Sequence, residues 1–256
     1  MDPADVIAAL RPLLPDVLVA TDFDGTLAPL VADPQSSRPV DGTIEALIAL
    51  ADRGAQIAVV TGRDAGTVLR LGGLDRVPGV VVAGLYGIET WAGGALTTPD
   101  TPEPMQVLQK RLPAVLEDAD PNLWIEDKRL SLVVHARKAP DPDAALEPLQ
   151  PRVQALADEL GLELHPGRDV LELRLPGFNK AGAIDRLAGD RRGVLYLGDD
   201  LGDLPAFAHV RELRASGRTA YGIAVRSSGV TEVHDAADAS VAEPADVVDL
   251  LRSLGS

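Results

Sequence analysis

Short apolar segments alternate with helical segments over the first 84 residues of this 256-residue chain, and this alternation constrains the fold more than any other feature. Residues 17–21, 56–60 and 80–84 are runs rich in Val and Ala, each long enough for one strand. Between them, residues 41–53 and 64–71 carry apolar side chains at helical spacing. Strands that are apolar throughout are typical of parallel sheets covered on both faces. The alternation therefore predicts a doubly wound α/β sheet.

The pattern changes in the middle of the chain. Residues 97–104 are rich in proline and threonine and are the best candidate for a linker. After it the order helix, strand, strand, helix, strand, strand predicts a small antiparallel sheet with two helices on one face. The α/β pattern then returns, so we expect a discontinuous core domain at residues 1–98 and 176–256 and an inserted domain at residues 99–175.

The boundaries of the remaining elements follow from the same patterns. In the insert we expect helices at about residues 105–117 and 143–160, strands at 123–126, 130–136, 162–165 and 170–175, and turns at 127–129 and 166–169. In the core we expect helices at residues 3–10, 180–188, 204–210 and 245–254, and strands at 193–197 and 220–225.

Composition excludes several classes of protein. A formal net charge of -15 makes nucleic acid an unsuitable partner, since phosphate backbones require basic patches. With no cysteine, the chain cannot use disulfides, thiolate metal sites or a cysteine nucleophile. The acidic N-terminus is unlike a signal peptide, and no apolar run is long enough to span a membrane. We expect a soluble cytoplasmic protein, and a monomer, with no nucleic-acid or membrane partner.

The first apolar run ends at two carboxylates. Asp22 and Asp24 belong to the string DFDGTL at residues 22–27. In open α/β sheets, ligands bind beyond the carboxyl ends of the strands. Two acids there can hold a hard cation, or one can attack phosphorus while the other transfers protons. A solvated turn that contains two aspartates is the alternative for such a pair taken alone.

Three further polar segments fall at predicted element ends. Thr61 follows the second strand, Lys180 begins a helix, and the string GDDLGD at residues 198–203 follows a late strand. Thr61 alone could belong to an ordinary turn, and Lys180 alone could be a solvated helix residue. The three acids Asp199, Asp200 and Asp203 repel one another unless a cation is present. Together the segments predict one composite site at the edge of the sheet.

In this order the four segments resemble motifs I to IV of haloacid dehalogenase-type (HAD) phosphatases, over nearly the whole chain. The αββαββ insert is similar to the C2B-type cap of that superfamily. The resemblance implies an α/β protein with a HAD-like Rossmannoid core, a parallel sheet, and an inserted α+β cap domain for substrate specificity. Several strings resemble trehalose-6-phosphate phosphatases in particular: residues 59–63 (VVTGR), 84–89 (GLYGIE), 134–137 (VHAR), 171–174 (LELR), 179–180 (NK) and 198–200 (GDD).

The resemblance also implies a reaction. Asp22 would be the nucleophile that forms an aspartyl-phosphate, and Asp24 would protonate the leaving sugar oxygen and later activate water. Mg²⁺ would be the cofactor, held by the Asp22 carboxylate, the Asp24 backbone carbonyl and Asp199. Asp203, with Asp200 as an additional candidate, would complete the metal site by orienting metal-bound water.

The remaining roles concern the substrate, a small sugar phosphate. Thr61 and the Gly62 amide would hold phosphoryl oxygens, and Lys180 would neutralise developing charge. Mg²⁺ and Lys180 would form a local pair of cations that can hold an anion even in a chain of charge -15, because the distant charges are screened within about 10 Å. The further candidates for substrate binding are polar residues of the second core motif, the cap and the start of the helix: Arg63, Glu126, Lys128, His135, Arg137, Glu172, Arg174 and Asn179.

Some of these assignments have alternatives. His135 could equally be a strand residue whose ring contacts backbone, and Arg137 and Lys128 could be solvated surface. The chain also departs from the common family pattern at Tyr86, at Ala181 and at residues 202–204, which leaves the exact sugar open.

The resemblance predicts hydrolysis of trehalose 6-phosphate to trehalose and phosphate. A phosphatase for another phosphorylated disaccharide or pseudo-disaccharide is the neighbouring alternative. A catalytically silent partner of the synthase that makes the sugar phosphate is the alternative from another class.

Overall fold

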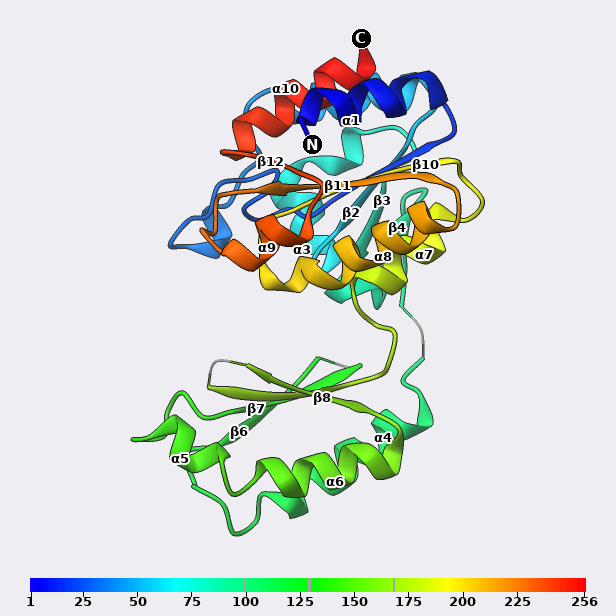
Figure 1. The fold of residues 1–256 in the computed structure, drawn as a ribbon. Helices are drawn as coiled ribbons and strands as arrows, with labels where there is room; N and C mark the ends of the chain where they lie inside the picture. The colour runs from blue at the N-terminus through cyan, green and yellow to red at the C-terminus, as the bar shows by residue number, and fades with distance from the viewer. Residues whose placement is uncertain (99, 129, 168) are drawn as a thin grey trace. The chain divides into compact units, whose positions relative to one another are not determined.

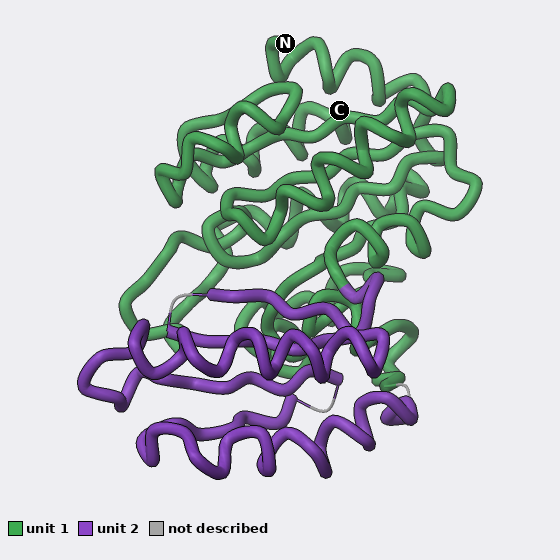
Figure 2. The backbone as a smooth tube through the Cα atoms, turned by 60° about the horizontal axis from the view of Figure 1, so that its bottom comes forward, with its two compact units in different colours: residues 1–98, 179–256 green, residues 99–178 purple. Residues whose placement is uncertain are grey.

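The structure, a computed structural model, describes residues 1–98, 100–128, 130–167 and 169–256. It divides into two compact units (Figure 2): unit 1 comprises Met1–Thr98 and Asn179–Ser256, and unit 2 comprises Pro99–Phe178. The second junction thus falls three residues later than the position proposed from the sequence. Pro99 of the predicted linker, and Arg129 and Arg168 of the two predicted turns, lie outside the described residues.

Unit 1 is built on a sheet of eight strands, most of them parallel (Figure 1). Every strand from β12 to β3 runs parallel to its neighbour, whereas β4 and β5 form an antiparallel hairpin at one edge. The order is β12 (Ala239–Val241), β11 (Thr219–Val225), β10 (Gly193–Gly198), β1 (Val17–Thr21), β2 (Gln56–Val60), β3 (Val81–Gly84), β4 (Glu89–Ala92) and β5 (Ala95–Thr97).

Helices cover both faces of this sheet, because each central strand is apolar on both faces. In β1, Val17 and Val19 belong to one apolar cluster, while Leu18 and Ala20 belong to the other. The first cluster is completed by α1 (Pro3–Leu10), α2 (Thr43–Asp52), α3 (Ala65–Gly72) and α10 (Pro244–Gly255), and the second by α7 (Lys180–Ala188), α8 (Leu204–Ala215) and α9 (Thr231–Ala236). The sheet therefore has no solvated face at its centre, and its carboxyl ends are where polar groups gather.

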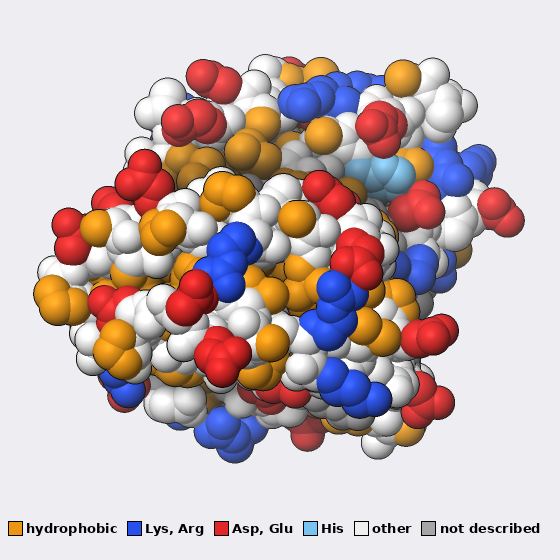
Figure 3. Space-filling view, turned by 90° about the horizontal axis from the view of Figure 1, so that it is seen from below, with side chains coloured by type: hydrophobic (Ala, Val, Ile, Leu, Met, Phe, Trp, Pro, Cys, Tyr) orange, Lys and Arg blue, Asp and Glu red, His pale blue; other side chains and the backbone are white. Residues whose placement is uncertain are grey.

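Unit 2 is a four-stranded antiparallel sheet with helices on one side (Figure 1). Its strand order is β6 (Trp124–Asp127), β7 (Ser131–His135), β9 (Val170–Arg174) and β8 (Glu163–Gly167), and its helices are α4 (Glu103–Val115), α5 (Pro142–Leu146) and α6 (Gln150–Leu160). Leu132 and Leu173 of the sheet share an apolar core with Leu108 of α4 and Val153 of α6. On the face of the molecule drawn in Figure 3, Lys and Arg side chains are interspersed with Asp and Glu side chains, so positive and negative charges are mixed on this face.

The structure differs from the sequence-based expectations at several elements. The helix expected at residues 143–160 is two helices, α5 and α6, and Pro151 lies in the first turn of the second. The hairpin of β4 and β5 was not expected, although Gly93 and Gly94 at its tip are a turn signal. Helix α9 and strand β12 were also missed, because both are short. Within the described residues, no helix combines the length and apolarity needed to cross a membrane.

Candidate active site

Asp22 is the first residue after β1, and both of its carboxylate oxygens have partners. Its backbone N–H donates to the carbonyl of Leu197 in the neighbouring strand β10, which fixes the residue at the carboxyl ends of the central strands. Oδ1 accepts a hydrogen bond from Phe23 N (2.6 Å), and Oδ2 lies 2.8 Å from Lys180 Nζ. Asp22 is 5% exposed and Lys180 is 2% exposed. The predicted nucleophile is therefore a buried carboxylate paired with a buried ammonium.

The turn after Asp22 interlocks with the loop after β10. Gly25 has a φ of +75°, and a Cβ atom there would lie 2.1 Å from Asp199 Oδ2, so this position requires glycine. Thr26 Oγ1 donates to Asp199 Oδ1 at 3.2 Å. Ser227 and Ser228 donate to the carbonyl oxygens of Gly25 and Asp199 respectively. The first and fourth sequence motifs are thus held together by direct contacts.

Asp203 is the most completely hydrogen-bonded acid of the site. It lies in the short 3₁₀ helix η5 (Leu201–Asp203) and is fully buried. Oδ1 accepts from Lys180 Nζ and from the hydroxyl of Tyr196, and Oδ2 accepts from the backbone N–H groups of Asp199 and Asp200. Asp203 therefore fixes Lys180 and the acidic loop in place. Sequence reasoning missed Tyr196, a polar aromatic residue in an otherwise apolar strand.

The second motif brings Arg63 to Asp24. Arg63 Nε lies 2.5 Å from Asp24 Oδ2 and Nη2 lies 2.7 Å from Asp24 Oδ1, a bidentate pair. Ser37 Oγ donates to Asp24 Oδ1 at 2.9 Å. Thr61 is buried and its Oγ1 accepts from Arg63 N at 3.2 Å. Arg63, which was predicted to bind substrate, is held by an acid in this structure, and Ser37 carried no sequence signal.

These residues surround a cavity of about 290 Å³ in unit 1. Tyr86, with a φ of 60° in the 3₁₀ turn η4 (Leu85–Gly87), contributes its side chain beside Gly62. The lining residues are Asp22, Asp24, Leu30, Thr61, Gly62, Arg63, Tyr86, Lys180, Asp199, Asp200 and Ser228. Every core motif found in the sequence therefore contributes to one cavity wall, with Asp203 behind it. Asn179, another predicted substrate ligand, accepts from Gly182 N and caps α7.

Burial and charge set the ionisation of this cluster. Burial raises the pKa of Asp22 to about 8 despite the nearby charge of Lys180, and it raises the pKa of Asp199 to about 7. The pKa of Asp203 is lowered, because Lys180 and its hydrogen bonds outweigh burial. For Lys180 burial is outweighed by Asp22 and Asp203, so its pKa is raised and it stays protonated. A further cation would favour ionisation of Asp22 and Asp199.

The acidic groups fit a hard divalent cation. Carboxylate oxygens of Asp22, Asp200 and Asp203 all lie within 4.8 Å of one another. Four donors already occupy the oxygens of Asp203, so the Asp22 and Asp200 carboxylates are the ones in this cluster that could bind an ion. Such hard oxygen ligands suit Mg²⁺ better than a soft metal. The geometry gives Asp200 a larger part in this cluster than the sequence suggested. Asp199, one of the predicted ligands, lines the same cavity.

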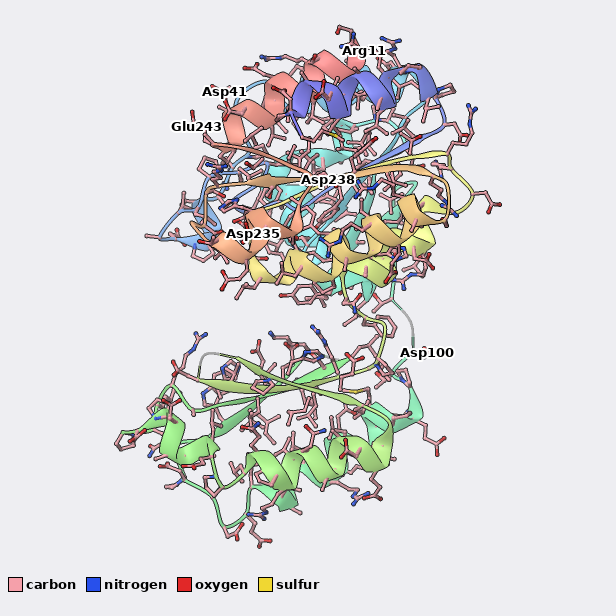
Figure 4. All side chains as sticks on the ribbon, viewed as in Figure 1. Arg11, Asp41, Asp100, Asp235, Asp238 and Glu243 are labelled. Carbon is pink, nitrogen blue, oxygen red and sulfur yellow. The ribbon has the colours of Figure 1, made fainter. Side chains whose placement is uncertain are left out.

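The predicted substrate residues of unit 2 gather on one face of its sheet. Leu132 and Leu173 are paired across the strands and face the helices, so Glu126, His135 and Glu172 lie on the opposite face. Figure 4 shows polar side chains projecting from that face. Arg174 lies on the same face, whereas Lys128 and Arg137 lie just beyond the ends of β6 and β7.

His135 has the most defined surroundings of this group. Its Nε2 lies 2.8 Å from Glu126 Oε2, and its ring stacks on Trp124 with the ring centroids 3.9 Å apart. The ring is largely buried, and its Nδ1 has no hydrogen-bond partner among the residues that the structure describes. A buried ring nitrogen without a partner can accept a ligand hydroxyl.

Comparison with known proteins places this chain in a family. A family model described as trehalose-phosphatase matches residues 20–245. The chain belongs to the trehalose-phosphatase family. A trehalose-phosphate phosphatase of Mycobacterium avium is 34% identical over 220 residues, which cover 81% of this chain and 54% of that protein. A Mycobacterium tuberculosis protein named as an uncharacterized glycosyl hydrolase is 31% identical over an alignment of 275 residues, which covers 99% of this chain.

The coverage of these relatives is partial. This chain spans about half the length of the Mycobacterium avium protein and 19% of the Mycobacterium tuberculosis protein. Among solved structures, trehalose-6-phosphate phosphatase of Aspergillus fumigatus matches with a TM-score of 0.80 at 24% identity, covering 100% of this chain and 97% of that chain. This likeness confirms the predicted fold class, a HAD-like α/β core with an inserted α+β unit.

Proposed function

We propose that the chain is a Mg²⁺-dependent phosphatase that hydrolyses trehalose 6-phosphate to trehalose and phosphate through an aspartyl-phosphate on Asp22. The observation that carries the proposal is the cavity where Asp22, Asp24, Thr61 and Lys180 meet. A nucleophile, a second acid, a hydroxyl and an ammonium at one cavity wall are the groups that phosphoryl transfer requires. Membership of the trehalose-phosphatase family supports the sugar.

In this proposal the Asp22 carboxylate attacks phosphorus while Asp24 donates a proton to the leaving sugar oxygen. Asp24 then takes a proton from the water that hydrolyses the aspartyl-phosphate. The ammonium of Lys180 stays protonated and offsets negative charge on the transferred group. Thr61 and the Gly62 amide hold phosphoryl oxygens at the cavity wall.

The residues that would hold Mg²⁺ come from two loops. Asp22 and Asp200 carry carboxylates in the acidic cluster, and the Asp24 carbonyl and Asp199 complete the expected donor set. When bound, the ion would supply positive charge that favours ionised carboxylates and stabilises the transferring phosphoryl group. Asp203 serves this site by holding the loop, since four donors already occupy its oxygens.

In the proposal, unit 2 is a cap domain that recognises the sugar. The partner-free Nδ1 of His135, together with Glu126 and Glu172 on the same sheet face, offers acceptors for sugar hydroxyls. A related phosphorylated disaccharide fits this reasoning as a second substrate class, because the departures at Tyr86 and Ala181 leave the sugar open.

Phosphate release from trehalose 6-phosphate, sucrose 6-phosphate and glucose 6-phosphate tests the proposal. We expect the highest kcat/KM with trehalose 6-phosphate, and activity that is lost with EDTA and restored with Mg²⁺. A preference for another sugar would overturn the assigned substrate, and metal-independent turnover would overturn the cofactor. Absence of turnover on every sugar phosphate would favour the silent partner of a synthase.

A further inference from the structure

Two side chains hold the carboxylate of Asp24, and one of them belongs to no motif. Arg63 donates to both oxygens, Nε to Oδ2 at 2.5 Å and Nη2 to Oδ1 at 2.7 Å. Ser37 Oγ donates to Oδ1 at 2.9 Å. Asp24 is partly exposed at the cavity wall, with a side-chain exposed fraction of 29%, and that of Arg63 is 18%. The predicted acid/base is thus restrained in a defined orientation.

Ser37 is unusual within its own loop. The residues from Leu30 to Ser36 are exposed, whereas Ser37 is fully buried. The adjoining 3₁₀ turn η2 (Pro34–Ser36) is tied to the same site, because Arg63 Nη1 donates to Pro34 O at 2.7 Å. The loop therefore packs in a way that directs one serine hydroxyl at Asp24, and Arg63 joins the loop to the carboxylate.

These contacts leave part of the Asp24 carboxylate open. Each carboxylate oxygen offers two lone pairs. Oδ1 of Asp24 accepts from both Arg63 and Ser37, while Oδ2 accepts from Arg63 alone. Among the described residues no other donor contacts this carboxylate. One lone pair of Oδ2 is therefore the position at which Asp24 can exchange a proton.

We infer that Ser37 and Arg63 are positioning residues for Asp24, an inference that rests on the proposed phosphatase function. They direct Oδ2 at the reacting group. As an Asp22 oxygen bonds to phosphorus, the P–O bond to the sugar breaks and its electron pair stays on the sugar oxygen, which takes the proton from Oδ2. In hydrolysis the water oxygen bonds to phosphorus while Oδ2 of Asp24 accepts a proton from that water. The bond between phosphorus and the Asp22 oxygen breaks, and its electron pair stays on the Asp22 oxygen.

A comparison of leaving groups tests this assignment. A sugar alkoxide requires protonation as it leaves, whereas p-nitrophenolate does not. The ratio kcat/KM reports the steps up to release of the leaving group, so it is the quantity to compare. We expect Ser37→Ala to lower kcat/KM for trehalose 6-phosphate about tenfold and that for p-nitrophenyl phosphate less than twofold. Ser36→Ala is the matched control, since Ser36 Oγ donates to Asp33 O, and it should change neither value.

Two further variants keep the test decisive. Arg63→Lys removes the bidentate pair and should lower kcat/KM for trehalose 6-phosphate more than that for p-nitrophenyl phosphate, which covers the case in which Ser37→Ala fails to fold. In the Asp24→Asn background, Ser37→Ala should add no further selective loss. Equal losses on both substrates, or none, in folded Ser37→Ala and Arg63→Lys variants would overturn the positioning role while leaving the phosphatase intact. A wild-type chain inactive on both substrates would overturn the proposed function and this inference with it.

Discussion

The acidic site of unit 1 and the polar sheet face of unit 2 are built in opposite ways. Lys180 and Asp203 are almost wholly buried, and each is held by several short contacts. In unit 2, Glu126 on the sheet face and Lys128 just beyond the end of β6 have side-chain exposed fractions of 40% and 38%, and their nearest charged atoms are 3.9 Å apart. Buried, multiply bonded charges are rigid, whereas exposed pairs contribute little to stability. The site for chemistry is therefore fixed, and the proposed sugar-binding face can vary at little cost.

The largest expected effect comes from changing Asp22, the proposed nucleophile. Asp22→Asn should lower kcat by roughly 10⁴-fold or more, because an amide cannot form the aspartyl-phosphate. The thermal midpoint should not fall, since a pKa of about 8 keeps Asp22 mostly protonated at neutral pH, close in shape to Asn, and Lys180 keeps Asp203 as a partner. Phosphate release and circular dichroism melts measure the two quantities. Retained turnover would remove Asp22 from the proposed role.

The next effect is on stability and concerns Asp203, which holds Lys180 and the acidic loop in place. Asp203→Asn should lower the free energy of unfolding by about 3 kcal/mol, because an amide NH₂ would face backbone donors and Lys180 would lose a partner. Urea unfolding measures this loss. A variant as stable as wild type would contradict the view that the unit 1 site is a single interlocked network.

A smaller effect is expected in unit 2. His135→Ala should raise KM for trehalose 6-phosphate about tenfold through the loss of a hydroxyl contact, with kcat/KM for p-nitrophenyl phosphate unchanged. His209→Ala is the control, because His209 contacts Glu212 on α8 in unit 1. Equal effects on both substrates would indicate that His135 supports the fold rather than the sugar.

The smallest expected effect is the pH dependence of the stabilisation by Mg²⁺, which competes with protons for Asp22 and Asp199. With pKa values of about 8 and 7 in the folded chain, Asp22 and Asp199 hold protons that the unfolded chain releases near pH 4. The metal-free folded state therefore loses stability as pH rises from about 4 to 8. Mg²⁺ must displace these protons, so the rise in melting temperature caused by Mg²⁺ should grow between pH 6 and 8. A rise that is independent of pH would contradict this.

The core of the site was predictable because each motif lies beside a strong local signal. The apolar runs predicted β1, β2 and β10, and parallel strands bring their carboxyl ends to one edge. The sequence alone therefore predicts that Asp22, Thr61 and Asp199 lie close together. The β4–β5 hairpin and the division of α5 from α6 were missed, since short elements carry little periodic signal.

What the sequence could not reveal is how side chains from distant segments share partners. Ser37 and Tyr196 are ordinary residues in the sequence, and their hydroxyls acquire importance only because folding brings them to Asp24 and Asp203. The sequence by itself determined which chemistry we propose, because the proposed nucleophile, acid and ammonium are residue types placed at strand and helix ends. Tertiary structure decided their orientation, because hydrogen-bond geometry in a buried site depends on contacts between residues far apart in the chain.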